Sequence, residues 1–444
     1  MIGCQVGDEG KLKVLTYFAS QVAEIFASNP ILADYYFSII RPQGSTNSGH
    51  TGVVKGRTHK MHGVSSGIMY DQCFALNGKK MYIPVRKIVA ELGGHIDHGL
   101  NITPDNFGIA ANAHVTLDHH LKEDQAAFSL KEHSSTGSGV MQTSRDKYGR
   151  TGMRFVEWLD HDLTVEIFKE KMFKKGLGNW ARRKFTNHFE RLSASYDSER
   201  EFLGQFLVEE NDILQDPRNL IKLFEMSQGS VLDIDSGEYD GITGSNPLEI
   251  PYLSEVIVGA FKSYVSSVGI HNRSFVTEMD AALADVLRDP FGEYGTTTGK
   301  PRHIGWFDIP QAKYAIDVGQ VTHLALTKLD TMEEFAKIGH PIKVAVAYRV
   351  NGQRHTRWDA SFLKRGVLKN NAVPEYIEVD PWERTVEDDG QTLTPGAQNY
   401  VNRLEELLER KFSLVGIGPA DDEMIVYENP LSSPLDLILH QEVK

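Results

Sequence analysis

The chain has 444 residues, of which 41% are hydrophobic and 24% are charged, and its formal net charge is −13. This composition is that of a globular protein with enough apolar residues to form a large core. The acidic balance argues against a general nucleic-acid binder, which needs a basic surface to replace phosphate counterions, but small phosphorylated ligands remain compatible with it.

Two cysteines, Cys4 and Cys73, offer neither metal-ligand spacing nor a disulfide framework, so we expect a reducing, cytoplasmic setting. No apolar run approaches the ~20 residues that span a bilayer. The chain also does not start with a basic region followed by a hydrophobic stretch. We therefore expect no membrane anchor and no secretion signal, and neither nucleic acid nor membrane as a partner.

Six glycine-rich turns interrupt the chain, and such turns are where a backbone can approach a ligand closely. They lie at Gly3–Gly10, Gly44–Gly56, Gly137–Gly152, Gly237–Gly244, Gly292–Gly305 and Gly416–Gly418. So many turns of this kind predict one large site that is assembled from several loops.

Between the turns, the residue patterns predict alternating helices and strands. Residues 155–225 interleave charged and apolar residues with few helix breakers, so we expect a helical insertion there. Thr322–Thr327 has the pattern of a short buried strand, Ile342–Tyr348 alternates with period two, and Tyr400–Leu408 repeats at helical spacing. The alternation predicts an α/β fold, a single large domain over residues 1–444 with a mostly parallel central sheet flanked by helices. Ligands of such sheets bind at the carboxyl ends of the strands.

The first candidate motif is Gly3–Lys13, GCQVGDEGKLK. Its glycine amides, Lys11 and Lys13 can surround phosphate oxygens, while Asp8 or Glu9 holds Mg²⁺ or takes a proton. The GxxxxGK[ST] spacing of a Walker A loop is missing. Taken alone, the segment fits a solvent-exposed turn of mixed charge better.

The second motif is Asn47–Thr51, NSGHT, which places His50 next to glycine and small polar residues. A histidine on an exposed loop suits proton transfer near neutral pH. A flexible loop whose histidine has no chemical role is the alternative, and an isolated SGHT favours it.

Two further motifs lie in the second half of the chain. Gly295–Asp308, GTTTGKPRHIGWFD, combines three threonine hydroxyls with Lys300 and Arg302, a set that can clamp a carboxylate or phosphate. Thr327–Asp330, TKLD, directly follows the predicted buried strand. Its carboxylate can accept from the ring N–H and exocyclic amine of guanine while the lysine stem covers the base. A solvated strand end is the alternative for this short match.

Taken in order, GDEGK, NSGHT, TGSG, LDID, GTTTGKPR, TKLD and GIGP resemble the adenylosuccinate synthetase family from about residue 3 to residue 430. The resemblance implies an adenylosuccinate synthetase-like fold and a GTP-dependent, Mg²⁺-requiring ligase of purine nucleotide biosynthesis. It implies that GTP phosphorylates the 6-oxygen of IMP and that L-aspartate then displaces the phosphate. The products would be adenylosuccinate, GDP and phosphate.

The resemblance also assigns the catalytic groups. Asp8 would be the general base that removes the proton from ring N1 and a ligand of Mg²⁺, with the Gly49 carbonyl on the same ion. His50 would be the acid partner that steadies the departing GDP oxygen, and Gln228 belongs to the same catalytic set. Deprotonating N1 makes the 6-oxygen nucleophilic, and a donor at the phosphoryl bridge stabilises the developing charge.

Substrate-binding positions follow from the same resemblance. It assigns GTP to Gly10, Lys11, Lys13, Gly49, Thr51, Arg302, Lys328, Asp330, Gly416 and Gly418. It assigns the purine monophosphate to Asn47, Thr136, Arg150, Gln228 and Thr243, and L-aspartate to Thr296, Thr297, Thr298, Lys300 and Arg302. Because the family supplies the arginine at Arg150 from the neighbouring subunit, the resemblance implies a homodimer.

Several segments depart from the family pattern. Val6 stands where tryptophan is usual, and Leu12 stands where glycine is usual. Ser135–Ser144, STGSGVMQTS, replaces the usual TTGxGIGPA loop, and Ser245–Ile250, SNPLEI, replaces the end of SSNTTAGG. Lys300 replaces the first arginine of TTTGRPR, which removes a planar bidentate fork.

These departures cluster around the base and sugar of the acceptor, so two acceptors stay open. Phage relatives that make 2-aminoadenylosuccinate from dGMP also carry STGxGxM, but they typically replace the base aspartate by serine. Asp8 is retained here, which favours IMP and leaves dGMP as the alternative. A catalytically silent nucleotide-binding regulator is a third alternative, and the retained acid–base pair of Asp8 and His50 argues against it.

Overall fold

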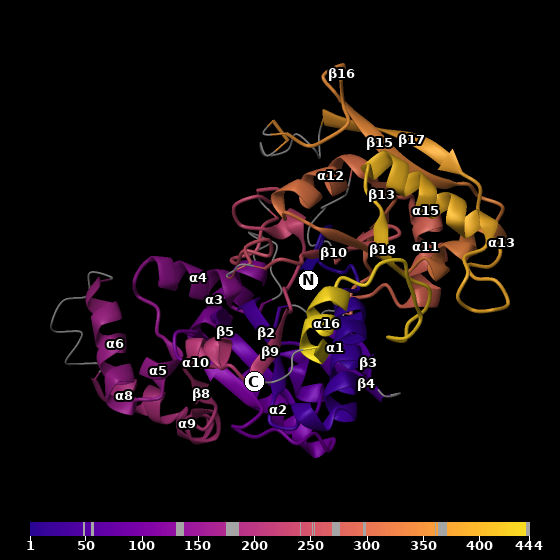
Figure 1. Ribbon diagram of the computed structural model, residues 1–444. Helices are drawn as coiled ribbons and strands as arrows, with labels where there is room; N and C mark the ends of the chain where they lie inside the picture. Colours follow the sequence, from indigo (N-terminus) through magenta and orange to yellow (C-terminus); the bar gives the residue numbers. More distant parts are fainter. Residues whose placement is uncertain are drawn as a thin grey trace.

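The computed structural model describes residues 1–47, 49–54, 57–129, 137–174, 186–239, 241–250, 252, 254–268, 276–295, 299–359, 361–362 and 371–440. The N-terminus lies at the centre of the molecule, between the indigo-to-magenta half of the chain and its orange-to-yellow half (Figure 1). Both halves therefore meet around the first glycine-rich turn.

Two mostly parallel sheets form the centre of the fold. In one, the strand order is β8 (Leu207–Val208), β6 (Phe107–Ala110), β5 (Cys73–Pro84), β2 (Tyr36–Gly44) and β9 (Asn219–Phe224), with β7 (His114–Thr116) parallel to the end of β5. In the other, the order is β1 (Ile2–Gly3), β10 (Val258–Lys262), β14 (His323–Thr327), β18 (Phe412–Gly416) and the antiparallel β19 (Met424–Val426). The predicted α/β fold with a mostly parallel sheet is confirmed.

The two sheets meet along a seam of close backbone contact at β1. Gly3 pairs with Gly229, just beyond β9, as an isolated parallel bridge. A Cβ atom on Gly3 would lie 2.5 Å from the Gln228 carbonyl oxygen, and one on Gly229 would lie 2.5 Å from the Gln5 carbonyl oxygen. Since real Cβ contacts are not that short, glycine is required at both positions. The seam aligns the carboxyl ends of β1 and β9 with those of β10 and β14.

Helices cover both faces of these sheets. The helices in chain order are α1 (Lys11–Ser28), α2 (Val85–Asp97), α3 (Asp118–Ser129), α4 (Val140–Tyr148), α5 (Phe155–Trp158), α6 (His161–Lys174), α8 (Thr186–Ala194), α9 (Asp197–Gly204), α10 (Glu210–Gln215), α11 (Ala281–Phe291), α12 (Ile309–Val318), α13 (Glu334–Lys337), α15 (Pro395–Leu408) and α16 (Ser432–His440). Alternation along β14 separates two cores: Ala325 faces the core that contains α1, while Leu324 and Leu326 face the core that contains α12 and α15. No helix of the described residues is long and apolar enough to cross a membrane.

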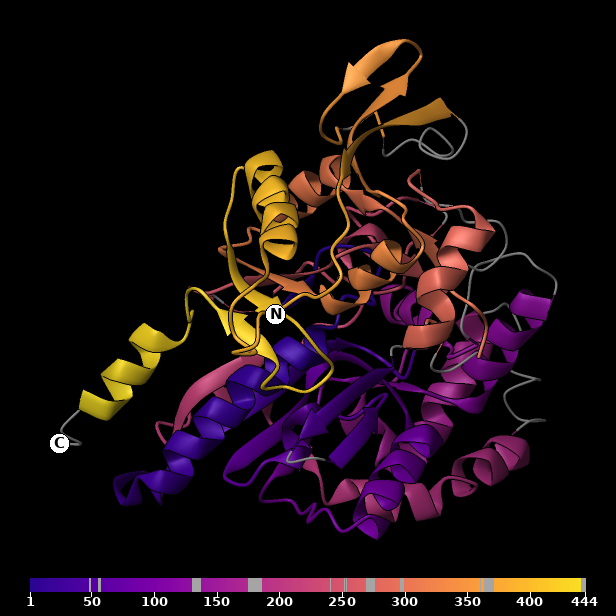
Figure 2. The same ribbon diagram turned by 90° about the vertical axis from the view of Figure 1, so that its right-hand side faces the viewer.

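Smaller sheets surround the central layer. β3 (His50–Val54) pairs with β4 (Arg57–Met61), and β11 (Val265–Ser267) pairs with β12 (His303–Gly305). β13 (Phe307–Asp308), β15 (Ile342–Val350), β16 (Gln353–His355) and β17 (Ala372–Val379) form a further sheet. Its outer strands stand away from the rest of the molecule in Figure 2.

The predicted elements of the second half are confirmed, with one local irregularity. β14 and α15 cover the expected buried strand and amphipathic helix. In β15, Ile342 and Val344 are buried in one core as the period-two pattern requires, but Val346 is only half-buried and Tyr348 packs in another core. The register shifts between Ala345 and Ala347, so the bulge at that point changes which face the following residues present.

The predicted helical range of residues 155–225 is wrong at its end. Helices α5, α6, α8, α9 and α10 occupy its earlier part, but Asn219–Phe224 forms β9, which pairs in parallel with β2. Asn219, Ile221 and Leu223 are buried while their neighbours are half-buried, the alternation of a strand. Hydrogen bonding to β2 therefore decides the conformation of these residues.

The seam leads to a stability prediction. Gly229→Ala should lower the free energy of unfolding by about 1–3 kcal/mol, because its Cβ would overlap backbone atoms that cannot rotate away. The control is Gly93→Ala, within α2, where an added Cβ meets nothing within 4 Å. That change should raise stability by up to about 1 kcal/mol through helix propensity. Urea unfolding measures both, and a Gly229→Ala protein as stable as the unmodified chain would contradict the proposed close contact.

Candidate active site at the strand ends

The loop that follows β1 is folded around a buried carboxylate. Glu9 is 1% exposed, and its Oε1 accepts from the backbone N–H of Gln5 at 2.9 Å and of Gly7 at 2.7 Å. Lys11 Nζ donates to Glu9 Oε2 at 2.8 Å and to the Gly7 carbonyl at 2.9 Å. Glu9 and Lys11 thus form an internal ion pair that shapes the loop, and Asp8, which is 25% exposed, faces outward.

The same loop packs against the end of β14. Gly10 caps α1 in the left-handed conformation, with φ 72°. A Cβ atom there would lie 3.1 Å from Thr327 Oγ1, which itself donates to the Glu9 carbonyl at 2.8 Å. The GDEGK and TKLD motifs, more than three hundred residues apart, are therefore in direct contact.

The GIGP stretch after β18 lies close to the GDEGK loop and the TKLD segment. Lys13 Nζ donates to the Gly418 carbonyl at 2.6 Å and to the Ala420 carbonyl, and burial lowers the pKa of Lys13. The Leu329 N–H donates to the Gly416 carbonyl at 3.3 Å. Burial raises the pKa of the neighbouring Asp330, with the charge of Lys328 opposing that shift. The TKLD and GIGP segments thus lie side by side.

Arg302 connects Asp8 to a fully buried carboxylate. Its Nη2 donates to Asp8 Oδ1 at 3.0 Å, and its Nη1 donates to Glu293 Oε2 at 2.7 Å. Glu293 is 0% exposed; its Oε1 accepts from Lys262 Nζ at 2.8 Å and from the Tyr264 hydroxyl. Lys328 Nζ lies 3.5 Å from the same oxygen. Four polar groups from three segments of the chain therefore meet at one carboxylate.

The charges of this cluster are strongly coupled. Burial alone would raise the pKa of Glu293, but the charges of Lys262, Lys328 and Arg302 hold that pKa below its ordinary value, so the group is ionised. Burial lowers the pKa of Lys262 to about 8, with Glu293 opposing the shift. Near neutral pH, three cations therefore surround two carboxylates, Glu293 and Asp8, and the site favours an anionic ligand.

A second group of side chains lies at the ends of β2 and β9. Gln43 Nε2 donates to the Ser227 carbonyl at 3.0 Å, which ties the two strand ends together. A Cβ atom on Gly7 would lie 3.3 Å from Gln228 Cα, so Gln228 adjoins the loop that carries Asp8. The Thr243 N–H donates to the Leu232 carbonyl at 2.7 Å, in the segment that follows Gln228.

Several polar atoms in this second group are buried without a hydrogen-bond partner among the described residues. They are Gln43 Oε1, Ser45 Oγ, Thr46 Oγ1, Asn47 Oδ1 and Gln228 Oε1. Buried polar atoms are nearly always paired in folded proteins, so a cluster of unpaired ones marks a place for a polar ligand. Asn47 and Gln228 are two of the residues expected to bind the purine monophosphate.

Arg150 does not belong to this buried group of residues. It is exposed, at the turn that follows α4, and its backbone is left-handed with φ 58°. Other expected site residues lie outside the described part of the chain. They are Thr136, Thr296, Thr297 and Thr298, together with the side chains of His50 and Thr51 in β3. Gly49 is half-buried just before β3, and Lys300 is exposed at the end of the GTTTGK segment.

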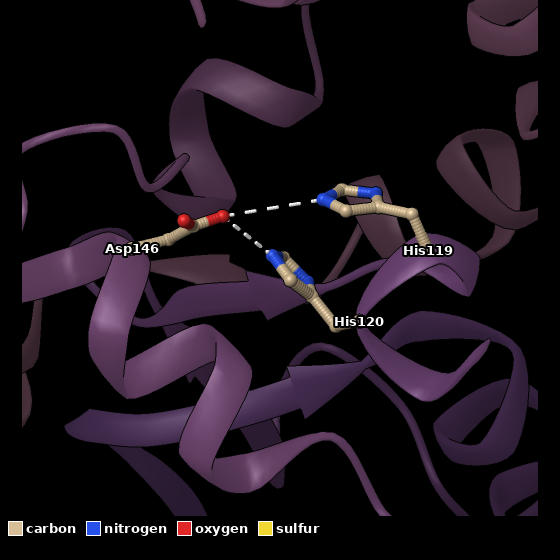
Figure 3. Close-up of side chains that lie close together, drawn as sticks. All are labelled: His119, His120 and Asp146. Atoms are coloured by element: carbon tan, nitrogen blue, oxygen red, sulfur yellow. Dashed lines mark hydrogen bonds and ion pairs between the residues drawn. The ribbon is translucent and has the colours of Figure 1, made fainter. Parts of the chain in front are cut away.

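A histidine–aspartate cluster supports the turn that carries Arg150. Figure 3 shows His119 and His120, from the start of α3, directed at the Asp146 carboxylate of α4. His120 Nε2 lies 2.8 Å and His119 Nε2 lies 4.0 Å from Asp146 Oδ2. The Thr151 and Gly152 amides donate to the Asp146 carbonyl at 2.8 and 2.9 Å, which closes the turn around Arg150.

These three side chains could hold a metal ion, but a lysine supplies the positive charge. Lys171 Nζ donates to Asp146 Oδ2 and lies 2.9 Å from His119 Nε2, between the atoms that an ion would need. The Leu117 N–H donates to His120 Nδ1 at 3.0 Å, so Nε2 of that ring carries the proton that bonds Asp146. Burial lowers the pKa of His120 to about 4, and the ring is neutral. The cluster is therefore a hydrogen-bonded support.

Comparison with known proteins identifies the family. The family model described as adenylosuccinate synthetase matches residues 1–425. The chain belongs to the adenylosuccinate synthetase family. It is an enzyme, a GTP-dependent ligase of purine biosynthesis that forms a C–N bond.

Curated relatives agree over nearly the full length. The adenylosuccinate synthetase of Caldanaerobacter subterraneus subsp. tengcongensis is 32% identical over 97% of this chain and 99% of its own. The adenylosuccinate synthetase of Nostoc punctiforme is 32% identical over 100% of this chain and 97% of its own.

Solved structures share the fold. The fully ligated adenylosuccinate synthetase of Plasmodium falciparum has a TM-score of 0.75 and 24% identity, covering 96% of this chain and 99% of that one. The succinoaminodeoxyadenylate synthetase of cyanophage S-2L, bound to dGMP and to dATP as an energy donor, has a TM-score of 0.55 and 17% identity, covering 98% of this chain and 96% of that one.

Within this synthetase site, residues outside the family motifs emerge only from the structure. Glu293 and Lys262 are buried beside Arg302, and Asp146 supports the Arg150 turn. Two sequence signals could have indicated the first pair: Lys262 ends the apolar run of β10, and Glu293 stands two residues before the GTTTGKPR motif. A charge at the end of a buried strand requires a partner.

The backbone at Gly10 leads to a prediction for this synthetase. Gly10→Ala should cost about 1–2 kcal/mol of unfolding free energy for the left-handed conformation, and it should also raise the KM for GTP because Thr327 must move. Gly339→Ala is the control: φ is 63° there and an added Cβ meets nothing within 4 Å. It should show the stability cost alone. Equal KM values for GTP in both variants would contradict the close contact with Thr327.

Proposed function

We propose that the enzyme joins L-aspartate to carbon 6 of IMP at the expense of GTP, through a 6-phosphoryl intermediate. The observation that carries this proposal is the retained Asp8 carboxylate, which faces outward beside Arg302 from a loop whose Gly7 adjoins Gln228. The motif order and the names of the curated relatives support the same reaction.

The proposed steps use the residues of the strand ends. Asp8 removes the proton from ring N1 of IMP, so that the 6-oxygen attacks the γ-phosphoryl group of GTP. His50 donates to the oxygen of the departing GDP, and Arg302 lies where it can offset phosphate charge. The amine of L-aspartate, held by the Thr296–Arg302 loop, then attacks carbon 6 and expels phosphate.

The unpaired polar atoms fit the binding of a purine monophosphate. Asn47 Oδ1 and Gln228 Oε1 are buried acceptors, and a nucleotide with its N–H and hydroxyl donors would satisfy them. Lys13, Lys328, Asp330 and the Gly416–Gly418 turn would hold GTP on the other side of Asp8. The two nucleotides would then meet at the Asp8 carboxylate.

Asp8 has the chemistry of a Mg²⁺ ligand, because it is a partly exposed carboxylate and this ion prefers oxygen ligands together with water and phosphate. The Gly49 carbonyl would be a second oxygen ligand. The ion would supply neutralising charge to the transferred phosphoryl group. Asp8 would then both hold the ion and accept the proton of ring N1.

We propose further that the enzyme is a cytoplasmic homodimer in which Arg150 binds the purine monophosphate of the partner subunit. Arg150 is exposed on its own subunit, as a residue that acts across an interface must be before assembly. The cytoplasmic setting is supported by Cys4 and Cys73, which are both free and buried.

A dGMP-using enzyme is the second candidate. Two buried atoms without a hydrogen-bond partner among the described residues, Gln142 Oε1 and Ser245 Oγ, lie in the two segments that depart from the family loops. The segments come close to each other, because a Cβ atom on Gly244, directly before Ser245, would lie 3.1 Å from Ser144 Cβ. New polar groups at that place fit an acceptor with a different base or sugar, and the fold is shared with a phage enzyme that binds dGMP.

The acceptor is tested directly with purified enzyme. With GTP, L-aspartate and Mg²⁺, IMP should be converted to adenylosuccinate, and dGMP should be converted far more slowly. Product formation is followed by ultraviolet absorbance and chromatography. Conversion of dGMP with no conversion of IMP would replace the first proposal by the second, and no conversion of either would contradict both.

Asp330 should determine the donor base. Guanine offers two donors to one carboxylate and adenine offers neither in that geometry, so Asp330→Asn should reduce the preference for GTP over ATP by about 1–3 kcal/mol. The ratio of kcat/KM for the two donors measures it. The control is Asp388→Asn, whose side chain is 96% exposed and pairs with Arg384, and which should leave the ratio unchanged. If ATP already serves the unmodified enzyme as well as GTP, the role given to Asp330 is wrong.

The shared site is tested by complementation. Arg150→Leu and Asp8→Ala should each be nearly inactive, since removal of a positioned base typically costs about 10²–10⁴-fold in rate. In mixed dimers, one of the two sites keeps both native residues, so activity should return in part when the variants are combined. Verified heterodimers without activity, or an active monomer, would contradict the proposal that Arg150 acts in trans.

A further inference from the structure

Glu293 is buried beside the site, and several polar side chains contact its carboxylate. It is 0% exposed, and its Oε2 accepts from Arg302 Nη1 at 2.7 Å. Its Oε1 accepts from Lys262 Nζ at 2.8 Å and from the Tyr264 hydroxyl, with Lys328 Nζ at 3.5 Å. The residue stands two positions before the GTTTGKPR segment and is not one of the reacting groups of the proposed reaction.

These contacts limit where two cations of the site can lie. The guanidinium of Arg302 is planar, so fixing Nη1 on Glu293 also fixes the direction in which Nη2 reaches Asp8 at 3.0 Å. Lys328 has a left-handed backbone with φ 59°, and its ammonium lies 5.9 Å from the centre of the Phe291 ring. The carboxylate therefore sets the side-chain positions of Arg302 and Lys328 together.

We propose that Glu293 is a positioning residue of the GTP site, which holds Arg302 for the phosphates and Lys328 for the guanine base in one arrangement. This inference rests on the proposed function, in which both cations bind GTP. Glu293 acts through them and does not touch the nucleotide.

If Glu293 acted only through its negative charge, it would weaken GTP binding, which is the opposite of what positioning predicts. A negative charge under an anion site weakens the attraction of phosphate, so its removal would leave GTP binding unchanged or make it tighter. Positioning predicts weaker binding, because Arg302 and Lys328 lose the acceptor that orders them. The direction of the change therefore distinguishes the two effects.

The test compares Glu293→Gln with Glu278→Gln. Glu278 lies in the same part of the chain, pairs with His303 and is 26% exposed. Equilibrium binding of a fluorescent GTP analogue should weaken on the order of tenfold in Glu293→Gln, the typical effect of losing a charged hydrogen bond, and stay unchanged in Glu278→Gln. In steady-state assays the KM for GTP should rise, while the KM for the acceptor nucleotide should stay within about twofold.

Two additional variants separate positioning from a general effect on folding. Glu293→Asp keeps the carboxylate and should restore part of the affinity, even if Glu293→Gln melts at a lower temperature. Lys328→Met should weaken binding less in the Glu293→Gln background than in the unmodified enzyme, because both changes act on the same group. Additive effects, or acceptor and GTP KM values that rise together, would overturn the proposal.

The binding measurement also distinguishes this inference from the proposed function. If the unmodified enzyme does not bind the GTP analogue, the role of Arg302 and Lys328 in GTP binding is wrong, and this inference fails with it. If the unmodified enzyme binds the analogue and Glu293→Gln binds it equally well or more tightly, only the positioning role of Glu293 is wrong.

Discussion

The rest of the structure depends on the close backbone contact between Gly3 and Gly229, where the two sheets meet. Neither position has room for a side chain. Because the chains approach this closely, the carboxyl ends of strands from both halves lie at one edge. Parallel strands present their loops on the same side, so the seam brings the GDEGK loop together with the residues after β9 and β14. The two nucleotides of the proposed reaction would bind at this edge.

In that site, the buried charged groups differ in the number of partners that they have. Glu9 and Lys11 are both nearly inaccessible and satisfy each other, which shapes the first loop without adding net charge. Glu293 is equally buried but serves more than one cation, so positive charge remains on the side where phosphate would bind. A buried ion is tolerated only with partners, and the choice of those partners therefore also decides what the accessible part of the site attracts.

The same argument applies to the acceptor nucleotide, because buried polar atoms also need partners. Gln228 has a left-handed backbone conformation, with φ 65°, next to Gly7, and its side-chain oxygen finds no protein donor among the described residues. Such an atom is costly in the free protein and becomes favourable when a ligand supplies the donor. Under the proposed function, Gln142 Oε1 and Ser245 Oγ, which also have no hydrogen-bond partner among the described residues, would lie where the acceptor is chosen.

Sequence alone determined the family, the α/β class and the strand and helix assignments of the second half, because ordered motifs and the periodicity of Ile342–Tyr348 or Tyr400–Leu408 are local properties. It did not determine residues 219–224, whose strand conformation depends on hydrogen bonds to β2. Nor did it reveal the ion pair of Lys11 with Glu9, which forms only in the folded loop. The role of Glu293 as a common acceptor was decided only by tertiary structure, since its partners come from segments up to about 35 residues away and meet through strand pairing, not through sequence spacing.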